Sequence, residues 1–152
     1  MPHAREKILE RLQKALRDER LALYCYDIQC EEARLAGHAG LASRLEILSR
    51  SHARHVELIA ARVRELGGVP QVFTPPNEML ERFRVLPRQD LCLALEHDLR
   101  TEDTQVETYG TLAVQSDART AHLCETLTQD DLRHVDWLRE ELVRGRKLDP
   151  PE

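Results

Sequence analysis

The chain has 152 residues and a formal net charge of −5, and 32% of its residues are charged whereas only 4% are aromatic. This length suits one domain, and the composition favours helices over sheet. Because Lys and Arg are interleaved with Asp and Glu, the sequence lacks the basic patch of a nucleic-acid-binding protein. It also lacks both an apolar run of the ~20 residues that span a bilayer and a signal peptide, so we expect a cytoplasmic protein without membrane partners.

The first half of the chain predicts two helices joined by a short turn. Apolar residues recur at alternating spacings of three and four, which is the period of one helix face. The first predicted helix, at about 5–36, shows this pattern at Leu9, Leu12, Leu16, Leu23, Tyr26, Cys30 and Ala33. The segment GHAG at 37–40 forms the turn, because glycine readily ends helices. The second predicted helix, at about 41–66, continues the pattern with Leu41, Leu45, Leu48, Ile59 and Leu66.

The second half predicts another pair of helices, at about 88–114 and 118–144. Their apolar stripes are Cys92, Leu95, Leu99, Val106 and Ala113, and then Cys124, Leu127, Leu138 and Leu142. The link before them, at 66–88, contains four prolines. Extended at ~3.3 Å per residue, such a link can run the ~40 Å length of a 26-residue helix. The sequence therefore predicts a single all-α domain over 1–152: two antiparallel hairpins joined by a long crossover, with helices two and three parallel.

The four cysteines do not indicate a zinc ribbon or a disulfide framework. They are scattered without CxxC spacing, at Cys25, Cys30, Cys92 and Cys124. Since three of them belong to apolar stripes, we interpret them as reduced residues that pack as small hydrophobes.

Acids and histidines interrupt the apolar stripe of every helix. The six residues are Glu19, His52, His55, Glu96, Asp131 and His134. Residues at i and i+3 share a helix face, so the pairs of the second and fourth helices can each point at one spot. The hairpins also repeat one another, because a lone glutamate precedes each pair by 33 residues in the first and 35 in the second.

A shared metal ion explains this pattern best. An isolated buried carboxylate costs several kcal/mol unless it is paired or binds a metal. Carboxylate and imidazole groups together suit first-row metals such as iron, manganese or zinc. Two alternatives remain open at this point: a buried hydrogen-bonded network, or helices rotated so that these groups meet water.

Four segments of the chain resemble bacterioferritin-type members of the ferritin-like superfamily. They are RDERLALYCY at 17–26, HVELIAARVRELGGVP at 55–70, LCLALEHD at 91–98 and RHVDWLREEL at 133–142. The resemblance runs from about residue 9 to residue 145 and implies a ferritin-like four-helix bundle. In that family, each half of the bundle supplies a lone Glu and a Glu-x-x-His pair to a di-iron ferroxidase centre.

The resemblance implies an iron site and assigns its ligands residue by residue. Glu19 and Glu96 match the two lone glutamates, and His55 and His134 match the two histidines. The first residue of each family pair is a glutamate that bridges the irons, and here those positions are His52 and Asp131. Auxiliary ligands could come from Asp103 and Asp130, although solvent exposure is the simpler expectation for Asp130. Tyr26 could hydrogen-bond a ligand or simply pack in the core.

Both departures concern the bridge between two metal ions. A neutral imidazole offers one lone pair, so His52 cannot bridge as a carboxylate does, and Asp131 has one methylene less reach than glutamate. Glu19, Glu96 and Asp131 supply −3 against the +4 of two ferrous ions. We therefore expect either one well-held ion with His52 as an added ligand, or two ions at reduced affinity. Three imidazoles also shift preference toward zinc, copper or nickel.

Two other family features are absent from the sequence. The position of the haem-ligating methionine is Ala53, so we expect no haem. The short fifth helix that lines the channels of the 24-subunit shell has no counterpart before the chain stops, so we expect a homo-oligomer that is by default a dimer. We assign no role to the remaining histidines, His3, His38, His97 and His122.

Two functional hypotheses follow. The first is a bacterioferritin-like protein that oxidises or sequesters Fe(II), in which Glu19 and Glu96 hold the metals, His55 and His134 add nitrogen ligands, and Asp131 forms any remaining bridge. The second is a relative that has lost ferroxidase activity and either binds one structural metal ion, such as zinc, or serves as an oligomeric scaffold. The altered bridging positions favour the second hypothesis, and the family resemblance favours the first.

Overall fold

The computed structural model describes residues 2–72, 74 and 88–148. It contains four helices: α1 (Pro2–Leu35), α2 (Ala39–Glu65), α4 (Arg88–Val114) and α5 (Ala118–Leu148). These bounds lie close to the predicted ranges, and the prediction of an all-α four-helix bundle is confirmed. Most of the predicted crossover, at 75–87, lies outside the described residues.

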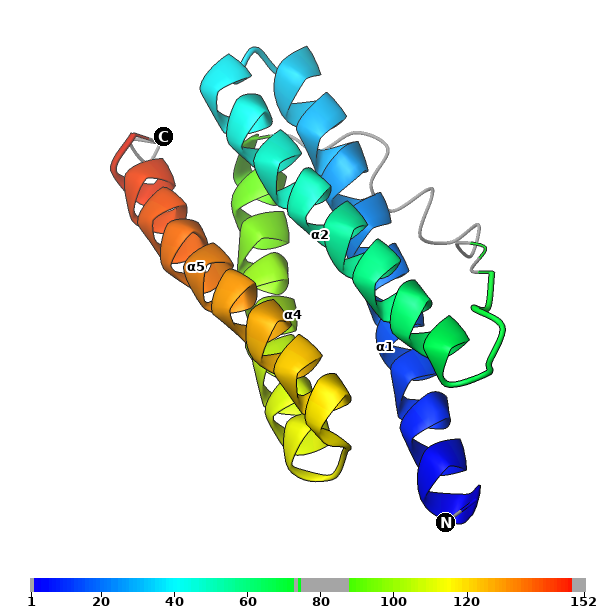
Figure 1. The fold of residues 1–152 in the computed structure, drawn as a ribbon. Coiled ribbons are helices and arrows are strands. Elements are labelled where there is room, and N and C mark those ends of the chain that lie inside the picture. The colour runs from blue at the N-terminus through cyan, green and yellow to red at the C-terminus, as the bar shows by residue number, and fades with distance from the viewer. Residues whose placement is uncertain (1, 73, 75–87, 149–152) are drawn as a thin grey trace.

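The helices form two antiparallel hairpins that pack side by side. α1 packs along α2 and α4 along α5, while α1 also meets α4 and α2 meets α5 (Figure 1). α2 and α4 begin at the same end of the bundle and run in the same direction, as predicted. The centre of the bundle is therefore surrounded by all four helices.

Glycines with positive φ end both helices of the first hairpin. Gly37 has φ of 84° and Gly67 has φ of 86°. After each helix the chain bonds back onto the last turn: the His38 amide donates to the Ala33 carbonyl, and the Gly68 amide donates to the Val63 carbonyl. Residues other than glycine pay a steric penalty in this left-handed conformation, which explains why the predicted turns fall at these positions.

A buried arginine joins the two hairpins at one end. Arg62 of α2 donates to Thr120 Oγ1 at 3.0 Å and to Asp117 Oδ1 at 2.8 Å. Asp117 precedes α5 and accepts a hydrogen bond from the Thr120 amide, so it caps that helix. The contact fixes the end of α2 against the start of α5.

The apolar core is divided into two clusters, one toward each end of the bundle. The first consists of Leu12, Ala15, Leu16, Ile59, Ala60, Val63, Tyr109, Leu112, Cys124 and Leu127. The second consists of Ala22, Tyr26, Cys30, Ala33, Ala42, Leu45, Leu48, Leu95, Leu138 and Leu142. All four helices contribute to each cluster. All four cysteines are free thiols, and three of them are buried, in agreement with their interpretation as small hydrophobes.

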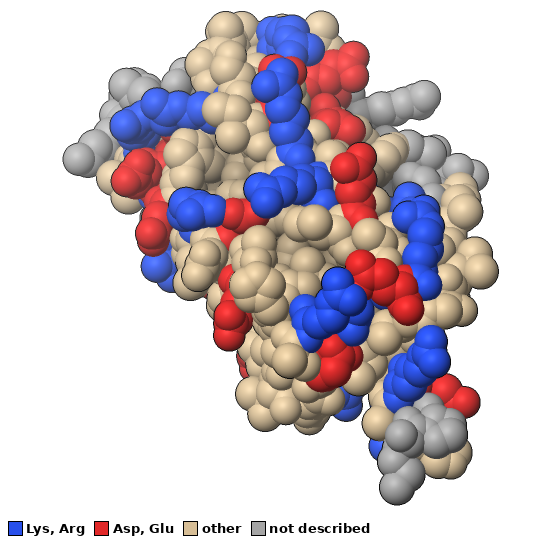
Figure 2. Space-filling model, viewed as in Figure 1, with Lys and Arg blue, Asp and Glu red and all other residues tan. Residues whose placement is uncertain are grey.

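The described surface carries charges of both signs. Figure 2 shows Lys and Arg side chains interspersed with Asp and Glu on the face that α2 and α5 present. Among the helices of the described residues, none is both long and apolar enough to cross a membrane.

Candidate metal centre

Five of the six predicted ligands converge between the two apolar clusters. Glu19, His52, His55 and Asp131 are 0% exposed and His134 is 8% exposed. Glu19 lies on α1, and His52 and His55 lie on α2. Asp131 and His134 lie on α5. The interrupted stripes of three helices thus form one buried polar layer, as the sequence pattern predicted.

The sixth predicted ligand, Glu96, lies elsewhere. Its side chain is only partly buried and belongs to neither of the two groups of candidate ligands described below. The carboxylate that α4 contributes is Glu102, which is 1% exposed. The prediction of Glu96 as a ligand is therefore corrected to Glu102. The two residues are six positions apart on α4, so their side chains lie on different faces of the helix.

A different repeat in the sequence would have identified Glu102. Tyr26 follows Glu19 by seven residues, and Tyr109 follows Glu102 by seven. The prediction relied instead on Glu96, which precedes Asp131 by 35 residues as Glu19 precedes His52 by 33, whereas Glu102 lies only 29 residues before Asp131. The difference between 33 and 29 residues is about one helical turn.

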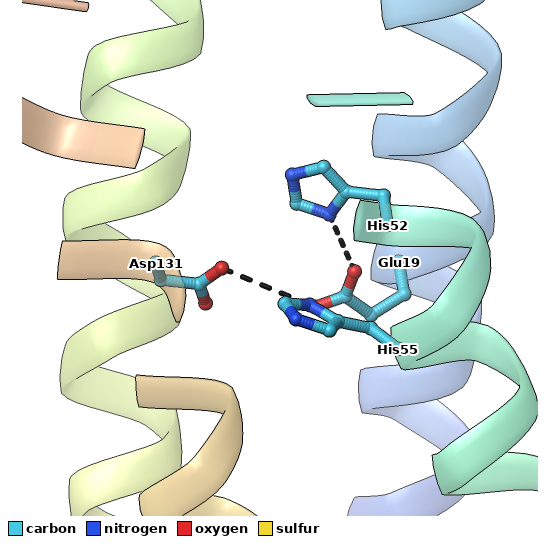
Figure 3. Close-up of side chains that lie close together, drawn as sticks. All are labelled: Glu19, His52, His55 and Asp131. Carbon is cyan, nitrogen blue, oxygen red and sulfur yellow. Dashed lines mark hydrogen bonds and ion pairs between the residues drawn. The ribbon is translucent and has the colours of Figure 1, made fainter. Parts of the chain in front are cut away.

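The converging side chains form two groups that could each hold a metal ion. The first group is Glu19, His52, His55 and Asp131, and the second is His52, Glu102, Asp131 and His134. Within each group, one potential ligand atom from every residue lies within 4.8 Å of the others. In Figure 3, Glu19, His52 and His55 lie on the side of α1 and α2, and Asp131 points toward His55 from the opposite side. Both groups share His52 and Asp131.

The His52 ring lies between the two glutamates. Its Nδ1 is 2.6 Å from Glu19 Oε2, and its Nε2 is 2.6 Å from Glu102 Oε1. The ring stacks on Tyr26, with centroids 5.0 Å apart and an interplanar angle of 17°. In this structure both nitrogens therefore have carboxylate partners, and the ring is held in place by an aromatic neighbour.

Asp130 holds His55 from outside the layer. His55 Nε2 is 3.0 Å from Asp130 Oδ2, while its Nδ1 faces Glu19 Oε1 at 3.3 Å. Arg133 donates to the other oxygen of Asp130. Asp130 is thus in contact with the site, not simply solvated, whereas Asp103 is exposed. A carboxylate on the outer nitrogen of a metal-binding histidine fixes the tautomer that leaves the inner nitrogen free for the ion.

Two tyrosines each bind the glutamate of the other hairpin. Tyr26 of α1 donates its hydroxyl to Glu102 Oε1 at 2.9 Å, and Tyr109 of α4 donates to Glu19 Oε1. Both rings are 2% exposed. The structure thus gives Tyr26 a hydrogen-bonding role in addition to its packing in the core.

Removal of either hydroxyl is expected to destabilise the metal-free protein. Tyr109→Phe or Tyr26→Phe should each lower the free energy of unfolding by about 1–3 kcal/mol, because a buried carboxylate loses a donor. Urea denaturation of the metal-free protein measures this. Tyr24→Phe is the matched control, since Tyr24 lies on α1 like Tyr26 but is only partly buried. Equal stability of all three variants would contradict the role assigned to the hydroxyls.

Burial and charge shift the pKa values of this layer in opposite directions. Burial alone would raise the pKa of Glu19, but the charge and hydrogen bonds of His52, together with His55, lower it to about 2. Burial would likewise lower the pKa of His52, but Glu19 and Glu102 raise it well above its ordinary value. Burial and the nearby Glu102 and Glu19 raise the pKa of Asp131 to about 7, against the lowering effect of His134. These shifts favour the imidazolium form of His52, which can donate to both glutamates, and they disfavour ionisation of Asp131.

Several buried polar atoms of the layer lack a hydrogen-bond partner in the described structure. They are both Asp131 oxygens, Glu102 Oε2 and His134 Nδ1. His134 Nδ1 lies 3.4 Å from both Glu102 Oε2 and Asp131 Oδ1. Unsatisfied buried acceptors are costly, and a cation between them would satisfy several at once. These residues therefore fit a metal ion in either group.

The layer approaches the surface at His134. A groove of about 530 Å³ between α2 and α5 is lined by Asp130, His134 and Trp137, together with Arg44, Ile47, Leu48, Arg50, Ser51, Arg54 and Arg133. The four residues of the first group are fully buried, so His134 is the ligand nearest to solvent.

The chain is similar to bacterioferritins in sequence and in structure. No protein-family model matches the chain. A bacterioferritin of Desulfovibrio desulfuricans is 28% identical over 135 residues, which are 86% of this chain and 72% of the relative.

Three solved structures support this similarity. The X-ray structure of the Desulfovibrio desulfuricans bacterioferritin, described with a diiron site in different catalytic states, has a TM-score of 0.83 and 25% identity over 96% of this chain and 84% of that one. The Rhodobacter capsulatus bacterioferritin, described with a metal-free dinuclear site and heme iron, has a TM-score of 0.79 and 27% identity. The match covers 95% of this chain and 89% of that one. A dodecameric thioferritin from Bacteroides fragilis has a TM-score of 0.76 and 20% identity, and the match covers 95% of this chain and 89% of that one. At this identity the similarity shows the fold alone. The chain therefore has a ferritin-like fold of the bacterioferritin type.

Proposed function

We propose that this chain is an iron-binding protein that takes up Fe(II) in the buried layer and oxidises or sequesters it there. The observation that carries the proposal is the convergence of three carboxylates and three imidazoles, almost without solvent contact, at the centre of a bacterioferritin-type bundle. Carboxylate and imidazole ligands suit ferrous iron, and iron is the metal of the relatives described above. The proposed ligands are Glu19, His52, His55, Glu102, Asp131 and His134.

The residues of this chain would act on Fe(II) in distinct ways. Fe(II) would arrive through the groove at His134 and displace the protons that the histidines carry in the metal-free state. The negative charge of Glu19 and Glu102 would favour the more highly charged ferric ion over the ferrous ion. Asp130 and the two tyrosines would act through the ligands that they contact, by holding His55, Glu102 and Glu19 in place.

Rapid mixing with Fe(II) in aerated buffer tests the proposal. The metal-free protein should speed up ferric absorbance several-fold over buffer alone, and Asp131→Asn should remove most of that acceleration, because the shared carboxylate loses its charge. Asp136→Asn is the matched control, since Asp136 is exposed on the same helix. Oxidation by the unmodified protein no faster than in buffer would refute ferroxidase activity.

One observation favours a second candidate function, a metal-binding protein without oxidase activity. One of the two shared positions is an imidazole, His52, and not a second carboxylate. In this case one ion, such as zinc, would cross-link the hairpins. The double variant His55→Ala/His134→Ala would then abolish the rise in melting temperature that Zn²⁺ produces in the unmodified protein, and Fe(II) oxidation would be absent in both.

We also propose that the chain forms a homo-oligomer. The solved structures with this fold include a protein described as dodecameric. Large apolar side chains are exposed along the described helices: Ile47 is 64% exposed, Leu93 61% and Val143 51%. Sedimentation velocity distinguishes a dimer from a shell, and a monomer would contradict the proposal.

A further inference from the structure

His52 is the residue that connects the two groups of candidate ligands through a single ring. Its Nδ1 belongs to the side of Glu19 and its Nε2 to the side of Glu102, with both contacts at 2.6 Å. The ring cannot turn freely, because it is 0% exposed, stacked on Tyr26 and edge-on to His55 at 5.4 Å. Each nitrogen therefore stays with its own group.

The chemistry of imidazole makes these two nitrogens unequal. A neutral imidazole has one lone pair available for a metal ion and one N–H that can only donate. If Nδ1 binds an ion in the first group, Nε2 carries the proton and donates it to Glu102. If Nε2 binds an ion in the second group, Nδ1 carries the proton and donates it to Glu19. In each case the opposite glutamate becomes the hydrogen-bond acceptor that metal-bound histidines commonly have.

An ion in one group thus disables the other group in two ways. The second nitrogen of His52 presents a hydrogen atom and not a lone pair, and the glutamate it faces is engaged as an acceptor. Asp131 is the only other residue that the groups share. Its Oδ1 faces both His55 Nδ1, at 3.8 Å, and His134 Nδ1, at 3.4 Å, so one carboxylate oxygen is directed to both sides.

Charge leads to the same result. Glu19, Glu102 and Asp131 carry −3 when ionised, so one divalent ion leaves the buried layer at −1 and two leave it at +1. The first ion therefore enters a buried layer of charge −3, whereas a second ion would meet a charge of only −1, too little to offset the cost of burying it. A second shared carboxylate in place of His52 would bring the total to −4 and balance two divalent ions.

We infer that the two groups are alternative sites, that the chain therefore binds one divalent ion and not two, and that His52 is the residue that excludes the second. This inference rests on the proposed metal-binding function and specifies its stoichiometry. It differs from the dinuclear sites described for the relatives with this fold.

Zn²⁺ titration of the metal-free full-length protein tests the stoichiometry. Calorimetry combined with elemental analysis after gel filtration should give one Zn²⁺ per chain, and His52→Glu should raise this to two. His122→Glu is the matched control: it makes the same substitution at an exposed position of α5 and should retain one ion per chain. Two ions bound by the unmodified protein would overturn the inference and leave metal binding intact, whereas no ion bound would refute metal binding itself.

Nitrogen NMR of the unmodified protein gives a second test that does not depend on a variant folding. In the Zn²⁺-loaded protein, His52 should show one metal-bound nitrogen and one protonated nitrogen. Two metal-bound nitrogens on His52, or two protonated nitrogens in the presence of bound Zn²⁺, would overturn the role assigned to this ring.

Discussion

Replacement of Glu19 by glutamine is expected to lower the free energy of unfolding of the metal-free protein by about 3–5 kcal/mol, the range observed when one partner of a buried ion pair is removed. Glu19 is fully buried and faces His52, His55 and the Tyr109 hydroxyl. Without its charge, the imidazolium of His52 would be left with Glu102 as its single carboxylate partner. Urea denaturation in the presence of a chelator measures the loss.

Glu10→Gln provides the matched control, because Glu10 is exposed on the same helix. Its free energy of unfolding should change by no more than about 0.5 kcal/mol. If Glu19→Gln were equally mild, the layer would be held by uncharged hydrogen bonds, and the ion pairs described above would not exist.

The second large effect concerns pH: a rise in pH should weaken the metal-free protein and should increase the stabilisation that bound metal adds. The raised pKa of Asp131, about 7, means that its contribution to stability is full below its ordinary value of 3.8 and is lost as the pH rises through 7. The raised pKa values of His52, His55 and His134 extend the loss above 6.5. Glu19, whose pKa is about 2, loses its contribution only as the pH falls below 4.5. The metal-free protein should therefore be most stable at about pH 5 and should weaken toward pH 8.

Bound metal should oppose this trend, because an ion competes with protons for the same ligand atoms. At a free Zn²⁺ concentration of 100 times Kd, binding adds about 2.7 kcal/mol. Since the apparent Kd falls as the ligands deprotonate, the rise in melting temperature should grow from pH 5 to pH 8. Differential scanning fluorimetry at fixed Zn²⁺ measures both curves. A shift that is the same at every pH would argue against binding in this layer.

The fold could be predicted from the sequence because its signals are local and mutually consistent. The three–four spacing of apolar residues marks each helix, and Gly37 and Gly67 fall at the turns that the spacing requires. The long link at 66–88 indicated the parallel course of the second and third helices before the structure confirmed it.

The site could be predicted wherever a polar residue that interrupts an apolar stripe also lies in the buried layer, which holds for three of the four helices. Glu19, His52, His55, Asp131 and His134 each stand where a stripe calls for an apolar residue, and all five meet in the layer. On α4 the sequence offers several acids within two turns, and the choice among them depends on how far the helix slides relative to α5. The apolar stripe does not specify that offset and favours Glu96, whereas the seven-residue spacing from glutamate to tyrosine that Glu102 shares with Glu19 indicates Glu102.

The contact of Asp130 with His55 illustrates a further limit. A helix position next to a ligand is ordinarily solvent-facing, and sequence periodicity alone assigns Asp130 to the surface. The structure shows instead that α2 and α5 approach closely enough for Asp130 to reach His55 Nε2 at 3.0 Å. Such contacts depend on interhelical distance, about which a single sequence says little.

The division of the core into two apolar clusters has a consequence for how this molecule opens. A bundle with one continuous apolar interior unfolds as one cooperative unit. In the described residues of this chain, the buried polar layer lies between two separate apolar clusters. When the net charge of the polar layer is zero and all its polar atoms are hydrogen-bonded, amide hydrogen exchange should report a single opening event for both ends of the bundle. When the carboxylates and histidines of the layer do not balance in charge, the two ends should open as separate foldons. Proton or metal binding in the layer would then determine how cooperatively the bundle unfolds.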